Sequence, residues 1–413
     1  MFLLLLSTAH AFCGAYVGAP GANLTNYSSE VVLAREGDRT TLTLVSDYAG
    51  DATEFALLLP VPTVLGPDDV GVIDPVLLDW IDAYSTPREV EYTCDTAFAA
   101  SPTMLGCGGV MGCGGSYSMY DTATDVESSW SAHGYDFVVL SAEESSGLLG
   151  WLEINGYAIP EGGEAVLQEY IDAGSFFLAA RVTLDPVAAR DGDWLWPIQV
   201  SYRADVFSLP IRIGTISSEG EQEVVIYTLT DPVAGGEVGI ANYPRLEIPT
   251  ECMLPPATTM MDWYAARIAD AHADGGAGWV REYSWELVPE VQGGYHCDPC
   301  TAEPVAPGGS FEPFGRNSDS AHLTRLRMRY TPAQATEDLQ LYVSGITGVK
   351  EQLKIIRRNP ELEELFPYCD TGWAEDPGTC PDAPLVRSAR APSPQASAFA
   401  LLAVLAMLRR RRA

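Results

Sequence analysis

Proline and glycine divide the body of the chain into short apolar runs. The 413 residues include 29 prolines and 38 glycines, and both residue types interrupt helices and central strands. Runs with period-two alternation are typical of strands, whereas apolar residues three and four positions apart are typical of a helix. Both patterns recur along the chain, which favours a fold of many short strands with a few interspersed helices.

The N-terminal part is predicted to be rich in strands. Residues 28–48 contain two alternating runs joined by Glu36-Gly37-Asp38, a pattern typical of a hairpin. Residues 55–61 form a continuous apolar strand, and Pro60 predicts a strand end or a sheet edge because proline donates no hydrogen bond. Apolar residues at helical spacing predict one short helix over residues 75–84.

The later part mixes helices and strands without strict βαβ alternation. Helical patterns cover residues 147–156, 164–173 and 260–273, while strand patterns cover residues 175–184, 196–203, 209–213, 223–229 and 279–287. This order predicts an α+β fold with mainly antiparallel sheets, stabilised by disulfides. We expect a β-rich domain over residues 12–135, an α+β domain over residues 136–350, and a cysteine-containing acidic segment over residues 351–384.

The N-terminus has the features of a secretory signal peptide. Residues 1–11 are apolar and end in the small-x-small triplet Ala9-His10-Ala11, which predicts cleavage before Phe12. Lipid attachment at Cys13 is the alternative, although the bulky Phe12 precedes it. We therefore expect the export machinery to carry the protein to the cell envelope or surface.

The C-terminus carries a second sorting signal. Residues 385–397 are a small, proline-bearing linker, and residues 398–413 join an apolar run to four arginines. This tail resembles the Myxo-CTERM and PEP-CTERM-like sorting tails, which implies processing by a C-terminal sorting protease. The nearest cysteine, Cys380, lies well upstream of the position that the Myxo-CTERM class uses. A weak membrane anchor is the alternative, because a transmembrane helix here would span only about 20 Å of a roughly 30 Å bilayer core.

The net charge of −32 excludes one class of partner. An acidic surface repels the phosphates of nucleic acids, so nucleic-acid binding is not expected. The charge identifies no extracellular ligand, since it also keeps an exported protein soluble.

Nine cysteines are natural for an exported chain and predict disulfides. Cys369 and Cys380 bracket a short acidic loop, so they are expected to form a local disulfide. Cys107 and Cys113 lie in a glycine-rich stretch whose flexible backbone lets sulfurs meet, and Cys94 is nearby. The sequence does not determine which of these three cysteines pair with one another.

Cys297 and Cys300 form the sharpest chemical motif, because two thiols three positions apart can form a disulfide, a redox pair or half of a zinc site. Their loop is rich in glycine and proline and does not begin a helix, which favours a structural disulfide. A zinc site would need further ligands such as His296 and His322. These two cysteines are the only catalytic candidates.

Calcium is the one cofactor that the sequence suggests. Oxygen ligands clustered in a loop suit this hard cation, and the best group is Asp370, Glu375, Asp376 and Asp382. The group does not match the EF-hand spacing, so a solvated acidic loop is the alternative. The sequence contains no G-x-S-x-G elbow, no H-E-x-x-H and no Walker A motif.

Seven segments in a fixed order carry a resemblance to a known family. They cover residues 57–64, 148–182, 197–205, 223–231, 242–249, 279–285 and 323–343. Together they resemble the bacterial domain of unknown function family 2330 over roughly residues 13–345, which implies no established reaction and no catalytic residues. We expect a non-enzymatic binding or structural module of the envelope. The alternatives are an exported hydrolase or thiol-disulfide oxidoreductase using Cys297 and Cys300, or a calcium-dependent adhesion module.

Overall fold

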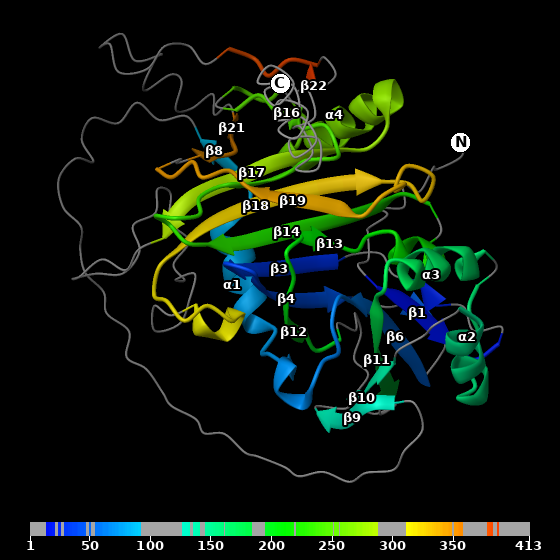
Figure 1. Ribbon diagram of the computed structural model, residues 1–413. Helices are drawn as coiled ribbons and strands as arrows, with labels where there is room; N and C mark the ends of the chain where they lie inside the picture. The colour runs from blue at the N-terminus through cyan, green and yellow to red at the C-terminus, as the bar shows by residue number, and fades with distance from the viewer. Residues whose placement is uncertain are drawn as a thin grey trace, which may run out of the picture.

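The computed structural model describes the body of the chain with several gaps. The described residues are 14–20, 24–25, 29–46, 49–50, 54–91, 126–132, 135–140, 145–160, 162–183, 195–218, 220–250, 252–255, 257–287, 311–348, 351–357, 378–382 and 386–387. Within them, two sheets pack face to face and helices cover both outer faces (Figure 1).

The larger sheet has eight strands in the order β20-β17-β18-β14-β3-β4-β12-β7. They are β3 (Ser29–Glu36), β4 (Arg39–Ser46), β7 (Val70–Val72), β12 (Ile198–Arg203), β14 (Gln222–Thr230), β17 (Gly278–Leu287), β18 (Ala321–Tyr330) and β20 (Glu351–Gln352). Neighbours are antiparallel except β14 and β3, which run parallel. The predicted hairpin is confirmed as β3 and β4, with Gly37 in the left-handed region at φ 60°.

The smaller sheet is antiparallel throughout, in the order β1-β6-β11-β10-β9. Its strands are β1 (Ala15–Gly18), β6 (Glu54–Val61), β9 (Val126–Ala132), β10 (Tyr135–Leu140) and β11 (Phe176–Thr183). Although β6 has neighbours on both sides, its pairing with β1 stops at Leu58. Among the described residues, Pro60 pairs only with β11, through Phe177. The predicted strand end is confirmed, because β6 ends at Val61, directly after Pro60.

Short strands and four helices complete the described fold. The strands are β2 (Leu24–Thr25), β5 (Ala49–Gly50), β8 (Arg88–Glu91), β13 (Ser208–Leu209), β15 (Val238–Ile240), β16 (Leu246–Glu247), β19 (Leu339–Val343), β21 (Lys354–Arg357) and β22 (Val386–Arg387). The helices are α1 (Val76–Ser85), α2 (Ser145–Ile154), α3 (Gly163–Asp172) and α4 (Met260–Gly275), and the short 3-10 helices are η1 (Pro67–Asp69), η3 (Ile213–Ser217) and η5 (Glu312–Phe314). The predicted strand over residues 209–213 is wrong, because β13 ends at Leu209, directly before Pro210.

Four apolar clusters hold the layers together. The largest lies between the two sheets and joins residues such as Phe55 and Phe137 of the smaller sheet to Ile226 and Met328 of the larger. Helices α2 and α3 lie together beside β1 and cover the outer face of the smaller sheet (Figure 1). Helices α1 and α4 cover the outer face of the larger sheet. The protein is therefore α+β with mainly antiparallel sheets.

Both sheets combine strands from before and after residue 135, where we expected a domain boundary. That position lies at the start of β10, which pairs with β9 on one side and β11 on the other. The parallel contact of β14 with β3 likewise joins distant parts of the sequence. Among the described residues, no helix is long and apolar enough to cross a membrane, and the tail lies outside them.

Candidate functional site

Most residues that the sequence singles out lie outside the described part of the structure. These are Cys107, Cys113, Cys297, Cys300, Cys369, Asp370, Glu375 and Asp376. Cys380, Asp382 and His322 are described.

Cys380 forms a disulfide with Cys252, so its predicted pairing with Cys369 is wrong. The two cysteines are separated by 128 residues, and their Cα atoms lie 4.9 Å apart. Backbone pairing brings them together, because Met253 N donates to Gly378 O at 2.8 Å and Cys380 N donates to Met253 O at 2.7 Å. Nearness in sequence favoured the wrong partner, since only the folded chain places Cys252 beside Cys380.

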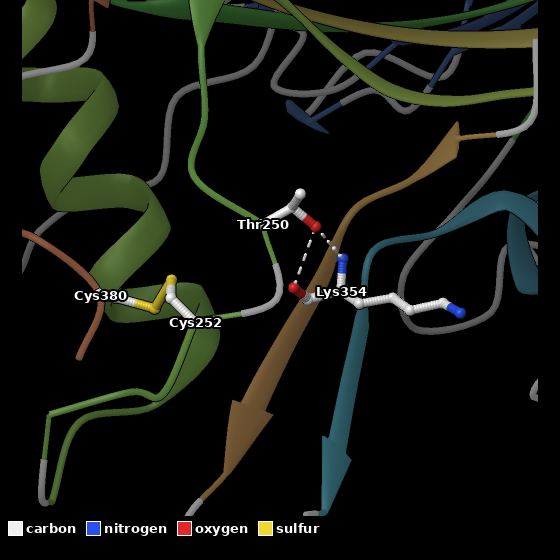
Figure 2. Close-up of a disulfide and its surroundings, with 4 residues drawn as sticks. All are labelled: Thr250, Cys252, Lys354 and Cys380. Carbon is white, nitrogen blue, oxygen red and sulfur yellow. Dashed lines mark hydrogen bonds between the residues drawn. A yellow bond between two sulfur atoms is a disulfide. The ribbon is translucent and has the colours of Figure 1, made fainter. Parts of the chain in front are cut away.

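The segment around Cys252 also pairs with β21, on its other side. Thr250 Oγ1 donates to Lys354 O at 3.2 Å and accepts from Lys354 N at 3.1 Å, next to the disulfide (Figure 2). Ile356 N donates to Cys252 O at 2.9 Å. Both cysteines are buried in the cluster that includes Trp263 and Ile268 of α4. The disulfide therefore fastens the C-terminal segment to the covered face of the larger sheet.

Asp382 and His322 both have protein partners. Asp382 is exposed, and its Oδ1 lies 4.0 Å from Nη1 of Arg267. His322 is buried on β18, where its Nε2 lies 2.8 Å from Ser284 Oγ of the neighbouring β17. Burial lowers the pKa of His322. In the described part of the chain, no group of three or more histidine, cysteine, aspartate or glutamate residues is arranged to hold a metal ion.

A buried network of charges lies beneath α1 and α4, and the sequence reading missed it. Glu282 sits at an irregularity in the register of β17, and its side chain is 0% exposed. It accepts hydrogen bonds from Arg325 Nε at 2.6 Å, from Arg327 Nε at 2.5 Å and from Tyr264 of α4 at 2.5 Å. One carboxylate thus joins two strands to the helix above them.

The network continues along the sheet in both directions. Glu223 of β14 accepts from Arg327 and Arg329. At the other end, Arg325 Nη1 donates to Asp82 Oδ1 of α1 at 2.5 Å. The arginines and carboxylates satisfy one another, as buried charges require. This arrangement fixes two helices and three strands.

The pKa values of two glutamates follow from this setting. Burial alone would raise the pKa of Glu282, but Arg327 and Arg325 outweigh that effect and lower it to about 2. Glu30 of β3 lies near the network, where Arg325 and Arg327 lower its pKa by less than burial raises it. Burial, reinforced by Asp82, raises its pKa to about 7.

A cavity of about 540 Å³ opens where the parallel strands β3 and β14 end. Its lining consists of Arg35, Glu36, Gly37, Phe207, Thr230, Asp231, Ala234, Gly235, Arg316 and Val343. Arg316 is almost wholly buried, and its Nη2 donates to Ser320 O at 3.2 Å. Its Nε and Nη1 have no hydrogen-bond partner, and the Glu36 carboxylate is 3.7 Å from Nη1. Burial lowers the pKa of this guanidinium, against the opposite effect of Glu36 and Asp231.

A second cavity, of about 530 Å³, lies beside β17 and β21. Its arginines are ion-paired, because Arg281 contacts Glu237 and Glu351, and Arg245 lies 3.3 Å from Glu247. Arginines that lie close to carboxylates therefore line both cavities, and Arg316 has two buried donors, Nε and Nη1, without a hydrogen-bond partner.

Comparison with known proteins identifies a family but no activity. No curated protein and no solved structure matches the chain. The profile of a family described as "Uncharacterized protein conserved in bacteria (DUF2330)" matches residues 7–342. The match ends within β19, so it includes Cys252 and stops before Cys380. Because this match covers most of the sequence, the chain belongs to the DUF2330 family.

Proposed function

We propose that the protein is an exported, non-enzymatic module that is held at the cell envelope or surface through its C-terminal tail. The observation that carries this proposal is the disulfide between Cys252 and Cys380. Structural disulfides persist in oxidising compartments and are rare in the cytosol. The disulfide thus agrees with a signal peptide over residues 1–11.

The position of the disulfide suits attachment through the tail. Cys380 precedes the linker of residues 385–397 by only a few residues. A pull on the tail therefore reaches Cys252 through a covalent bond, and from there the apolar cluster under α4. Without this bond, the described pairings that would resist the same pull are those of Thr379 with Met253 and of β22 with β16, which are weaker because each rests on a few hydrogen bonds.

The charge network supports a structural role for the larger sheet. Glu282, Arg325 and Arg327 bind one another and are shielded by α1 and α4, so they brace the sheet instead of facing a substrate. The partners in this proposal are the export machinery and a C-terminal sorting protease. The tail supplies the contact with the membrane.

Fractionation of the bacterium that makes the protein tests this proposal. Three forms are compared with one antibody: the full chain, a form lacking residues 1–11, and a form lacking residues 398–413. The full chain is expected in the envelope with Phe12 as its first residue, the first deletion in the cytoplasm, and the second in the periplasm or medium. A full chain that stays in the cytoplasm with residues 1–11 attached would sink the proposal.

A further inference from the structure

We propose that the cavity at the ends of β3 and β14 is a binding site for a small monocarboxylate that carries an apolar group, with Arg316 as the residue that receives the carboxylate. This inference goes beyond attachment to the envelope and does not depend on export. It begins from a buried guanidinium whose Nε and Nη1 have no hydrogen-bond partner, with the Glu36 carboxylate 3.7 Å from Nη1. Leaving a buried polar donor unpaired destabilises the protein, and the effect is larger for a charged group.

The local fold holds Arg316 in place. Gly315 has a φ of 81°, and a Cβ there would lie 2.4 Å from Thr41 Oγ1 of β4. Only glycine therefore lets the loop after η5 press against the sheet at this point. Arg316 N donates to Phe311 O at 3.2 Å, which fixes the backbone before the side chain enters the cavity. The guanidinium is thus placed before any ligand arrives.

The remaining charges explain why a singly charged acid is preferred. Arg35 adds positive charge, although its donors already serve Asp38 O, Thr40 Oγ1 and Ala204 O. The Asp231 carboxylate accepts from Val233 N at 2.8 Å and Ala234 N at 2.7 Å, so it is held as a wall of the cavity. With Glu36 also present, a doubly charged phosphate would meet more repulsion than a carboxylate does.

The other walls are suited to an apolar group. Phe207 lines the cavity, and the Arg35 guanidinium lies 5.3 Å from the centre of its ring. Val343 and Ala234 add aliphatic surface. A volume of about 540 Å³ falls in the range of small-molecule sites, which combine mostly apolar walls with a few polar groups.

Calorimetric titration of the full chain with benzoate, benzamide and inorganic phosphate tests the site. Benzoate is expected to bind at least tenfold more tightly than either of the others, because benzamide lacks the charge and phosphate carries too much. Arg316→Met should weaken benzoate binding at least tenfold. Arg203→Met is the matched control, since Arg203 is exposed and pairs with Asp38 at the surface; it should bind like the unchanged protein.

A second variant keeps the test decisive if Arg316→Met does not fold. Val343→Trp adds an indole to an exposed position on the cavity wall and leaves Arg316 unchanged. It should also lose benzoate binding at least tenfold. The proposal is overturned if benzoate does not bind, if benzamide or phosphate binds as tightly, or if a folded Arg316→Met or Val343→Trp variant binds benzoate normally.

Discussion

Glu282 accepts three buried hydrogen bonds within the charge network. Its two oxygens hold Arg325, Arg327 and Tyr264 within a region closed to water. A buried carboxylate of this kind adds little to stability compared with apolar packing. Its removal nevertheless lowers the free energy of unfolding, because the buried arginines lose a charge that compensates their own. Breaking an exposed ion pair, by contrast, changes the free energy of unfolding very little, because water screens the two charges.

Replacement of Glu282 tests this difference. Glu282→Gln should lower the free energy of unfolding by about 3–5 kcal/mol, because two buried guanidinium groups lose their shared carboxylate. Asp38→Asn is the control, since it breaks the exposed pair with Arg203 and should cost about 1 kcal/mol or less. Urea denaturation measures both. Equal costs for the two substitutions would show that the network does not brace the sheet.

Glu30 gives the protein a predicted pH dependence. Its folded pKa of about 7 lies above the ordinary value of 4.5, so the folded state binds the proton more tightly than the unfolded state does. The stability that this proton supplies is fully present below about pH 4.5 and is lost as the pH rises through 7. Glu30→Gln should therefore gain stability relative to the unchanged protein between pH 5 and pH 8, by about 1–3 kcal/mol. Urea midpoints across this range measure it, and a constant difference between the two proteins contradicts the assignment.

The residue scale also shows where sequence reasoning fails. Arginine alternates with apolar residues over Arg325, Arg327 and Arg329, and such alternation normally marks a strand with one face in water. Here that face is covered by helices, and the carboxylates that neutralise it come from β17, β14 and α1. Sequence patterns did not point to Arg316 either. Its loop has no motif, and its cavity exists only after β3 and β14 pair.

At the scale of elements, the sequence predicts those helices, turns and strand ends that are determined by neighbouring residues. The hairpin of β3 and β4, the end of β6 directly after Pro60 and the four helices follow from turn residues and from periodicity. Each predicted helix lies within two residues of its observed bounds. The strand expected over residues 209–213 failed because Pro210 ends β13. Pairing order was beyond prediction, since β14 meets β3 across nearly two hundred residues.

At the scale of the whole molecule, one disulfide joins the family body to the segment that leads to the tail. A link between residues 128 apart removes a large loop entropy from the unfolded chain, by about 5 kcal/mol in the simplest treatment. The disulfide is also the clearest chemical sign of the compartment that we propose, because a structural disulfide persists in an oxidising environment. The export and the attachment that we propose, and part of the stability, therefore all depend on the bond between Cys252 and Cys380.

The disulfide map of the native protein tests this account most directly. Cells are lysed with iodoacetamide, and the protein is cut without reduction by trypsin and endoproteinase Glu-C, so that Glu375 separates Cys369 from Cys380. We predict a linked pair of peptides that contains Cys252 and Cys380 and separates on reduction. Alkylated Cys252 and Cys380, or a peptide that links Cys369 to Cys380, would contradict the account.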